Sequence, residues 1–263
     1  MQQQGQITDD GSVTFPDKVA MSIERLRHFE PPEGYLLKYS GGKDSDIILH
    51  LAKVAGVKFQ AQYNLTTVDP PELVHYIKRE HPEVEISKPA MTMWQLIVKK
   101  GFPPTRVVRY CCDVLKERDD KDRRLITGIR WAESNRRSKR RMVEQCFKRS
   151  STLFVNPIID WADEDVWCYI HTNGVTYCRL YDEGFKRLGC VMCPMQGPKG
   201  MERDAKRWPK IYQAYLRTFG RMLDKKWKQE GFNAIKFHTA EDVMHWWIYN
   251  PPKGDPDQGV LFE

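Results

Sequence analysis

The apolar and polar positions alternate between strand-like and helix-like patterns over the first 160 residues of the chain. Short apolar runs at 35–39 and 57–65 predict buried strands. Residues 44–55 carry apolar side chains at helical spacing, and a proline opens a second helix over 70–80. The same patterns predict helices at 17–30 and 91–100 and strands at 84–87, 122–131 and 151–160. Strands that alternate with helices predict an α/β fold, a mostly parallel sheet with helices on both faces.

The pattern changes after about residue 160. A helix is expected at 163–174, and a loop rich in Gly, Cys and Pro follows at 182–200. Long helical stretches are expected at about 202–230 and 239–248. Four aromatic residues of the first stretch recur at helical spacing, which is more typical of a buried core than of a platform for stacked bases. They are Trp208, Tyr212, Tyr215 and Phe219.

These patterns predict three regions: a flexible leader (1–17), a nucleotide-binding α/β domain (18–160), and a helical C-terminal part (161–263) packed on the same core. No apolar stretch is long enough to span a membrane, and the N-terminal residues do not resemble a signal peptide, so we expect a cytoplasmic protein without membrane contact. The formal net charge is +7 and the pI about 9.0. This balance favours polyanionic partners such as nucleotides and nucleic acids, although it also serves solubility alone.

One short segment has the chemistry of an anion site. The sequence LLKYSGGKDSDIILHLAK, residues 36–53, places a glycine turn between a predicted strand and a predicted helix, but it does not match the Walker P-loop. Two glycines let backbone N–H groups approach an anion, and the positive end of the following helix points at the same place. An ordinary turn is the weaker alternative. The predicted anion-binding residues are Ser40, Gly41, Gly42, Lys43, Asp44 and Ser45.

This segment resembles the SGGxDS loop of the N-type ATP pyrophosphatases, and specifically of the phosphoadenosine phosphosulfate (PAPS) reductase family. The stretches TTVDPPEL (66–73), GIRWAESNRR (128–137) and NPIIDWADEDVWCYI (156–170) are similar to further elements of that family. The resemblance implies an adenine-nucleotide α-hydrolase-like, Rossmann-like sheet and cleavage of ATP between its α and β phosphates with Mg²⁺. It implies catalytic roles for Lys43, Asp44 and Arg130, the last as a contact to phosphate or sulfate, and places Thr67, Asp69 and Gly128 beside the nucleotide.

Four of the seven cysteines form two close pairs, Cys111-Cys112 and Cys190-x-x-Cys193. In a cytosolic protein, such pairs suit zinc or a [4Fe–4S] cluster, or can serve sulfur relay or structure alone. A vicinal pair is unusual for structural zinc and favours the larger cluster. The spacing resembles the iron–sulfur pattern of adenylylsulfate (APS) reductases, which implies that these four residues hold a [4Fe–4S] cluster. Cys168 is expected to pack inside a buried helix.

The resemblance also bears on the reaction. Sulfonucleotide reductases of the family use a cysteine in a C-terminal Glu-Cys-Gly-x-His segment, and this sequence has no cysteine after Cys193, which counts against reduction. Cluster-bearing members without that segment include the sulfur-transfer proteins of DNA phosphorothioation. We therefore expect an ATP pyrophosphatase that adenylates an acceptor for sulfur transfer, with the DNA backbone as the first candidate. The expected partners are a cysteine desulfurase, as the source of sulfur, or other subunits of a modification complex. Two alternatives stay open: an APS or PAPS reductase, and a nucleotide-gated scaffold subunit of a nucleic-acid modification complex.

A basic run, RRSKRRMVEQCFKR at 136–149, follows the predicted Arg130 element. Contacts from such side chains to phosphates give salt-sensitive affinity that does not depend on base sequence. A solvated surface loop is the alternative. The residues predicted to contact nucleic acid are Arg136, Arg137, Lys139, Arg140 and Arg141.

Overall fold

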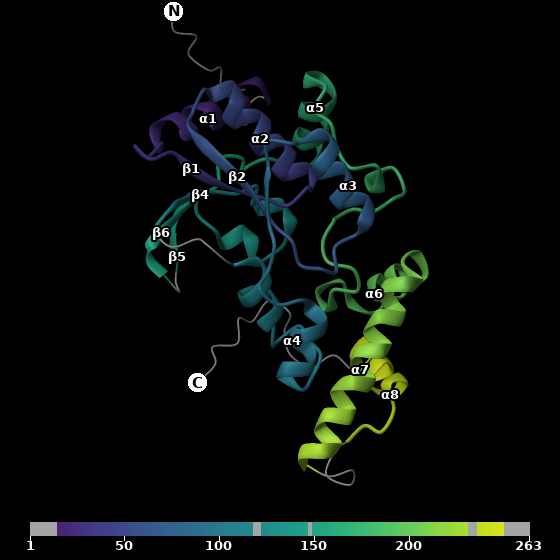
Figure 1. Cartoon of the computed structure of the whole chain (residues 1–263). Helices are drawn as coiled ribbons and strands as arrows, with labels where there is room; N and C mark the ends of the chain where they lie inside the picture. The colour runs from purple at the N-terminus through teal and green to yellow at the C-terminus, as the bar shows by residue number, and fades with distance from the viewer. Residues whose placement is uncertain (1–14, 118–121, 147–148, 231–235, 250–263) are drawn as a thin grey trace, which may run out of the picture. The chain divides into compact units, whose positions relative to one another are not determined.

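A computed structural model (Figure 1) describes most of the chain. The described residues are 15–117, 122–146, 149–230 and 236–249. Most of the predicted leader, residues 1–14, lies outside these ranges, and helix α1 begins at Phe15. The C-terminal residues 250–263 also lie outside them.

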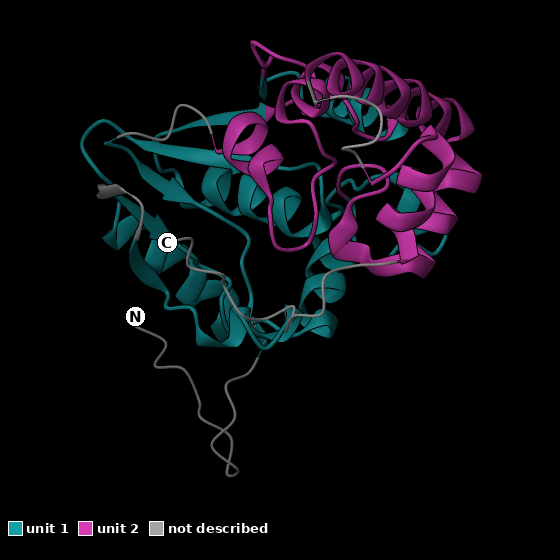
Figure 2. Ribbon diagram, turned by 90° about the horizontal axis from the view of Figure 1, so that it is seen from below, with its two compact units in different colours: residues 1–63, 72–86, 119–188 teal, residues 64–71, 87–118, 189–263 magenta. Residues whose placement is uncertain are grey.

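The chain divides into two compact units, and each consists of several segments (Figure 2). Unit 1 comprises residues 1–63, 72–86 and 119–188. Unit 2 comprises residues 64–71, 87–118 and 189–263. The C-terminal region contributes to both units, because residues up to 188 belong with the N-terminal half and those from 189 onward belong to unit 2.

Unit 1 is built on a six-stranded, mostly parallel sheet, as the alternating pattern predicts. The strand order is β3-β2-β1-β4-β6-β5. Strand β1 runs parallel to both β2 and β4, β4 runs parallel to β6, and β5 pairs antiparallel with β6 at the edge. The strands are β1 (Tyr35–Tyr39), β2 (Phe59–Asn64), β3 (Glu85–Ser87), β4 (Arg124–Ile126), β5 (Val143–Cys146) and β6 (Arg149–Val155).

Four helices accompany this sheet: α1 (Phe15–His28), α2 (Lys43–Ala55), α3 (Pro71–Glu80) and α5 (Asp163–Asn173). Helix α2 packs against β1, α1 and α5, and its fully buried face contains Ile47, Ile48 and Leu51. It ends where Gly56 adopts the left-handed conformation, φ +70°, and its N–H donates to the Lys53 carbonyl. Glycine adopts this conformation without steric cost, so the sequence itself terminates the helix.

Strand β1 lies at the point where the order of the strands changes: β2 and β3 follow on one side of it, and β4 and β6 on the other. Its neighbour on one side is β2, the next strand in sequence, and its neighbour on the other side is β4 (Leu37 pairs with Ala61 and with Ile126). Loops that leave the carboxyl ends of such neighbouring strands diverge and open a crevice, which is where α/β sheets bind ligands. The Ser40–Ser45 segment leaves β1 at this point.

Unit 2 contains α4 (Met93–Lys100), α6 (Gly197–Arg207), α7 (Pro209–Glu230) and α8 (Ala240–Tyr249). Their core is aromatic: the Tyr215 ring lies 4.9 Å from Trp94 and 4.8 Å from Trp247, and Trp247 Nε1 donates to the Pro104 carbonyl oxygen at 2.6 Å. The expected core stripe is confirmed for three of its members, since Trp208, Tyr215 and Phe219 are buried, whereas Tyr212 is only half-buried.

Some local predictions differ from the structure. Strand β5 lies inside the basic run, where its polar sequence gave no strand signal. The helical stretch expected at 202–230 is two helices that meet at Trp208, because the following proline disfavours a helical conformation at that residue. Cys168 is exposed on α5, so its expected burial was wrong. Strand β4 is also shorter than predicted.

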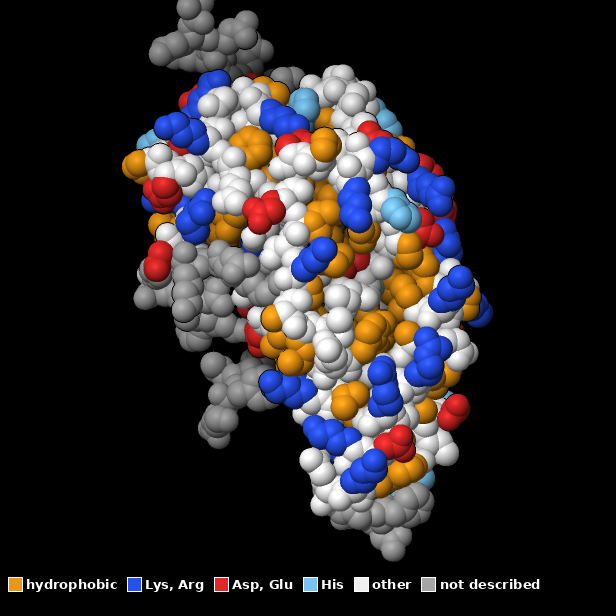
Figure 3. Space-filling model, in the orientation of Figure 1, with side chains coloured by type: hydrophobic (Ala, Val, Ile, Leu, Met, Phe, Trp, Pro, Cys, Tyr) orange, Lys and Arg blue, Asp and Glu red, His pale blue; other side chains and the backbone are white. Residues whose placement is uncertain are grey.

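Surface features agree with the composition. Lys and Arg side chains predominate over acidic ones on the face shown in Figure 3, in keeping with the net charge of +7. Among the described residues, none of the helices combines the length and the apolar character that a membrane crossing requires.

We expect Leu51→Ala to destabilise the protein by about 2–5 kcal/mol, because the side chain is fully buried in α2 and its removal leaves a cavity. The matched control is Val54→Ala on the same helix, where the side chain is 51% exposed and the expected change is below about 0.5 kcal/mol. Urea unfolding of both variants measures the difference. Equal losses in the two variants would contradict the assignment of the buried face.

Candidate functional site

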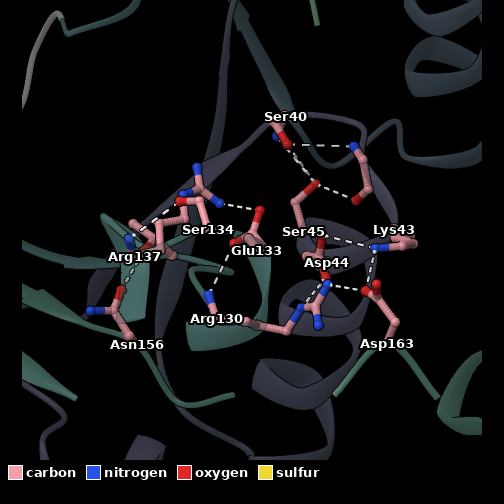
Figure 4. A network of polar contacts seen from close by, with 12 residues as sticks. Ser40, Lys43, Asp44, Ser45, Arg130, Glu133, Ser134, Arg137, Asn156 and Asp163 are labelled. Carbon is pink, nitrogen blue, oxygen red and sulfur yellow. Dashed lines mark hydrogen bonds and ion pairs between the residues drawn. The ribbon is translucent and has the colours of Figure 1, made fainter. Parts of the chain in front are cut away.

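The turn between β1 and α2 is held by its own side chains. Ser45 Oγ donates to the Gly42 carbonyl oxygen at 2.7 Å, and the Ser40 and Ser45 hydroxyl oxygens lie 3.1 Å apart (Figure 4). The Gly42 N–H donates to Ser40 Oγ at 3.4 Å. The two serines therefore shape the loop, in addition to any contact that they make with an anion.

Two glycines are important for the shape of the site, for different reasons. Gly41 has φ +70°, and a Cβ there would lie 2.6 Å from Leu73 Cδ1 and 2.9 Å from Ile77 Cδ1. A Cβ at Gly128, after β4, would lie 2.9 Å from Asp44. The obstacle at Gly128 includes the Asp44 backbone, so the segment after β4 approaches the loop this closely only because glycine occupies the position; at Gly41 the neighbours are the ends of flexible side chains, and the positive φ is what favours glycine.

Lys43 opens helix α2 and is largely buried, with 7% of its surface exposed. Its backbone N–H donates to the Tyr181 hydroxyl at 3.0 Å. Its ammonium nitrogen lies 3.4 Å from Asp44 Oδ2 and 3.6 Å from Asp163 Oδ1. The positive charge is thus held at the helix N-terminus by two carboxylates.

Arg130, which was expected to contact an anion, pairs with two carboxylates of the protein in this structure. Its side chain is 1% exposed, and its Nε donates to Asp44 Oδ1 at 2.7 Å (Figure 4). Its Nη2 donates to Asp163 Oδ1 at 2.6 Å and its Nη1 to the Trp161 carbonyl at 3.1 Å. The hydrogen bond from Arg130 holds the pKa of Asp163 below its usual value. Arg130 therefore orients two carboxylates, rather than presenting its guanidinium to solvent.

Lys43, Asp44, Arg130 and Asp163 form what we call the charged quartet, two cations and two carboxylates beside the loop. Carboxylate oxygens are the ligands that Mg²⁺ prefers. Asp163 is the accessible member, with 66% of its side chain exposed, whereas that of Asp44 is 21% exposed. The quartet can hold a phosphate through the Lys43 ammonium group and a divalent ion through its carboxylates, which Arg130 orients.

A buried carboxyl lies one residue beyond the loop. Asp46 is 1% exposed, accepts a hydrogen bond from the Tyr39 hydroxyl through Oδ1, and has no partner for Oδ2 among the described residues. His81 Nε2 lies 3.6 Å from Asp46 Oδ1 and 3.0 Å from the Tyr76 hydroxyl. Burial raises the pKa of Asp46 to about 8, so this carboxyl keeps a proton at neutral pH. Burial likewise lowers the pKa of His81.

The two cysteine pairs both belong to unit 2. A short π-helix begins at Cys112, and the Glu117 N–H donates to the Cys112 carbonyl at 2.9 Å. The other pair is anchored at the segment 66–69, because Cys190 Sγ donates to Thr66 Oγ1 at 3.4 Å. The half-buried, disulfide-free thiols are Cys111, Cys112, Cys190 and Cys193.

These thiols interact electrostatically with one another and with Lys116, which sequence reasoning missed. A hydrogen bond from Cys111 lowers the pKa of Cys112 to about 6, with help from the Lys116 charge. Burial raises the pKa of Cys190 to about 11, and Lys116 opposes this effect. The Cys190 thiolate in turn raises the pKa of Lys116. The site thus combines thiols with a cation that favours their anionic form.

The donor set has the chemistry of cluster ligation. A zinc site brings four donors to one centre at about 2.0–2.3 Å, whereas a [4Fe–4S] cluster binds each thiolate to a different iron. Within the ranges that the structure describes, no three His, Cys, Asp or Glu side chains converge tightly enough for one metal ion. Four thiols outside any disulfide are the donor type that a [4Fe–4S] cluster requires.

Thr67 and Asp69, expected beside the nucleotide, belong to unit 2 with the cysteines, whereas the loop, Gly128 and Arg130 belong to unit 1. The Asp69 carboxylate accepts the Thr66 N–H at 2.7 Å, and Thr67 Oγ1 accepts the Met93 N–H at 2.9 Å. Thr67 adopts φ +68°, which is uncommon for a residue with a Cβ. The Asp69 side chain thus closes the turn, and the Thr67 side chain links the turn to the start of α4.

The predicted basic residues divide into two groups. Arg137 pairs with Glu133, and Arg140 pairs with Glu144. The others are exposed and have no ion pair within the described part of the chain; they are Arg136, Lys139 and Arg141. Trp131, which is 43% exposed, lies in the same segment, and its Nε1 donates to the Arg140 carbonyl at 2.7 Å. Unpaired cations beside an exposed indole are typical of nucleic-acid surfaces.

Sequence reasoning missed several residues of the site for a common reason. Their partners are distant in the sequence, and a single sequence does not show such pairs. Asp163 and Tyr181 make hydrogen bonds to Arg130 and Lys43, and Lys116 interacts through its charge with the cysteines. A weak signal existed for Lys116, since a cation four residues after Cys112 is well placed on a helical turn to face a thiol.

The chain matches the model of a known protein family. The family model described as "Phosphoadenosine phosphosulfate reductase domain" matches residues 34–196. An uncharacterized protein of Methanocaldococcus jannaschii is 29% identical over 210 residues, which cover 73% of this chain and 51% of that protein. The adenosine 5'-phosphosulfate reductase of Shouchella clausii is 25% identical over 223 residues, 78% of this chain and 90% of that enzyme. The chain spans about half the length of the curated relatives that head this comparison.

Solved structures agree at the level of the fold. The PAPS reductase from Candida auris has a TM-score of 0.50 and 19% identity, and the match covers 70% of this chain and 96% of that enzyme. A variant of the FMN adenylyltransferase from Candida glabrata has a TM-score of 0.50 and 16% identity, with 68% and 62% coverage. These likenesses support the adenine-nucleotide α-hydrolase-like sheet that the sequence predicts.

We expect Asp46→Asn to remove a pH dependence of stability. The folded protein binds a proton at Asp46 up to about pH 8, whereas the unfolded chain releases it near its ordinary pKa of 3.8. The wild-type free energy of unfolding therefore falls as pH rises between these values, by up to about 1.4 kcal/mol per pH unit relative to the variant. Chemical denaturation at several pH values between about 5 and 7 measures this difference in slope.

The control is the same comparison in a His81→Gln background, which removes the other titrating group in contact with Asp46. The difference in slope should persist there. Parallel pH profiles for the wild type and Asp46→Asn would show that Asp46 ionises normally.

Proposed function

Because this chain belongs to the phosphoadenosine phosphosulfate reductase domain family, we propose that it is an ATP pyrophosphatase that activates an acceptor for sulfur transfer. The observation that carries this proposal is the Ser40–Ser45 loop, a preformed glycine turn with a buried lysine at the start of α2. Such a turn binds pyrophosphate through backbone N–H groups and the helix dipole. The loop also leaves β1 at the point where nucleotides bind to sheets of this class.

In the proposed reaction, an oxygen of the acceptor attacks the α-phosphorus of ATP. A new P–O bond forms as the bond between the α-phosphorus and the bridging oxygen breaks, and pyrophosphate leaves with the electron pair. The N–H groups of Gly41 and Gly42 and the ammonium group of Lys43 stabilise the charge that develops on this leaving group. Asp44 and Asp163 would hold Mg²⁺, which when bound neutralises phosphate charge.

Arg130 acts in this proposal as a positioning residue. Its guanidinium holds Asp44 and Asp163 in place, so its effect on the reaction passes through those carboxylates. Gly128 has the complementary task of leaving room for Asp44. Thr67 and Asp69, which the resemblance assigned to the nucleotide, shape the turn at the Cys190 loop, and we assign them to the sulfur-handling part of the protein.

The four clustered cysteines would hold a [4Fe–4S] cluster, which when bound can carry or deliver sulfur. One residue near them supports ligation: the Lys116 charge lowers the pKa of Cys112 and opposes the burial that raises the pKa of Cys190, so it favours the thiolate form of both. A cysteine desulfurase or another subunit of a modification complex is the proposed source of the sulfur, which arrives as a persulfide and takes two electrons from a thiol reductant to reach the level of sulfide.

We propose the DNA backbone as the acceptor. A phosphate oxygen is a poor leaving group, and adenylation converts it into part of AMP, which sulfur can displace. The support is the net charge of +7 together with the exposed cations Arg136, Lys139 and Arg141, which lie in the same segment as the exposed Trp131. Backbone recognition by such residues is independent of base sequence.

A second candidate function is reduction of a sulfonucleotide. The relatives named adenosine 5'-phosphosulfate reductase favour it, since the match to that of Shouchella clausii extends over 90% of the enzyme. The loop and the quartet would then hold the phosphate and sulfate groups of the substrate, and no pyrophosphate would form.

The purified protein should release pyrophosphate from ATP in the presence of Mg²⁺ and DNA. Lys43→Met should lower this release at least about 100-fold, because it removes a charge that faces the leaving group. The matched control is Lys53→Met in the last turn of the same helix, where the side chain is half exposed and the activity should be unchanged. A coupled pyrophosphate assay measures each rate.

Three outcomes separate the candidates. Stimulation by DNA that is lost in the Arg136→Gln, Lys139→Gln, Arg141→Gln triple variant, with basal release intact, supports a DNA acceptor. Sulfite formed from APS or PAPS with a thiol reductant would instead establish the reductase. Nucleotide binding without pyrophosphate release, even with DNA and a desulfurase, would contradict an enzyme and favour a scaffold subunit.

Anaerobically purified protein should contain about four iron and four sulfide ions per chain. Cys190→Ser should lose most of both, since it removes one ligand, whereas Cys168→Ser, at an exposed position on α5, should retain them. Metal and sulfide analysis with visible absorption spectra measures the content. Zinc without iron in the wild type would contradict the cluster assignment.

A further inference from the structure

A phenol hydroxyl contacts the phosphate loop. Tyr181 ends the 3₁₀ turn Arg179–Tyr181 of unit 1, and its hydroxyl accepts the Lys43 N–H at 3.0 Å across 138 residues of sequence. A Cβ at Gly42 would lie 3.3 Å from the same hydroxyl oxygen. The hydroxyl therefore lies against the backbone that is proposed to hold pyrophosphate.

The hydroxyl proton of Tyr181 is available to a ligand. Burial raises the pKa of Tyr181, so the group is a neutral phenol at any ordinary pH. Its one recorded hydrogen bond in the described part of the chain uses the oxygen as acceptor, from Lys43. Among the described residues the O–H therefore has no protein acceptor, and it lies next to a loop whose N–H groups are also donors.

The position of the ring is fixed by its neighbours. Trp167 packs edge-on against Tyr181 with ring centres 5.6 Å apart, and Tyr177 packs at 6.4 Å. The Tyr181 N–H donates to the Cys178 carbonyl at 3.1 Å, and the Gly184 N–H donates to the Tyr181 carbonyl at 3.0 Å. Because the ring and the backbone are both held, the hydroxyl is oriented before a ligand binds and loses little freedom on binding.

We propose that Tyr181 is a direct ligand of the pyrophosphate group, an inference that rests on the function proposed above. The hydroxyl accepts from Lys43 N–H and donates to a phosphate oxygen, which gives the chain N–H···O–H···O⁻. A hydrogen bond that the oxygen accepts polarises the O–H, so the bond to the anion becomes stronger. The Tyr181 hydroxyl thereby relays the hydrogen bond of the Lys43 N–H to the phosphate.

The test compares Tyr181→Phe with the wild type in binding of inorganic pyrophosphate, ATP and adenosine by calorimetry. The expected result is about tenfold weaker binding of pyrophosphate and ATP, the size of one charge-assisted hydrogen bond, with unchanged binding of adenosine. The matched control is Tyr177→Phe, whose hydroxyl donates to Asp182 at 3.0 Å instead of contacting the loop, and whose affinities should equal those of the wild type. Thermal unfolding of both variants verifies that they are folded.

The outcomes separate this inference from the proposed function. Equal affinity in Tyr181→Phe and wild type, or tighter binding in the variant, would overturn the inference, and tighter binding would identify Tyr181 as a plug that the anion displaces. A tenfold loss supports Tyr181 as a ligand even if the wild type releases no pyrophosphate from ATP, a result that would contradict only the proposed reaction. A wild type that binds neither pyrophosphate nor ATP would overturn both.

Discussion

The buried guanidinium of Arg130 is the interaction on which the candidate site depends. It crosses from the segment after β4 to the start of α2 and joins the partly buried Asp44 to the exposed Asp163, while its own side chain is only 1% exposed. A charge in such a place is costly unless it is fully paired, and loss of one partner typically destabilises by about 3–5 kcal/mol. The loop, the helix that follows it and α5 are therefore coupled through a single side chain, and the loop keeps its shape without a ligand.

The two kinds of chemistry in this chain belong to different units. Unit 1 contains the groups suited to phosphate, and unit 2 contains the thiols with the 66–69 turn that supports them. Different interactions stabilise the two units. Ion pairs and close packing at glycines stabilise the site in unit 1, whereas aromatic packing around Tyr215 and hydrogen bonds at the 66–69 turn stabilise unit 2. A protein that activates with one part and handles sulfur with the other would need only these two preformed arrangements.

Much of the fold followed from the sequence, because burial and turn chemistry leave local marks. The Ser40–Ser45 loop was predictable from its glycines, and so was the parallel sheet from its alternating elements. The role of Arg130 was not, because the residue type fits an anion contact as well as a buried bridge, and the choice depends on Asp163, 33 residues away. Strand β5 was missed because an edge strand that exposes polar residues carries no apolar pattern.

The charge balance of the quartet has a consequence for how the protein would distinguish its anionic ligands. The two cations beside the loop are paired with two carboxylates and are largely buried, and dilute salt screens contacts to such buried groups little. The cations Arg136, Lys139 and Arg141 are exposed and unpaired among the described residues, and their contacts to a polyanion release counterions. Under the proposed function, a rise in ionic strength would therefore weaken the binding of nucleic acid much more than the binding of the nucleotide.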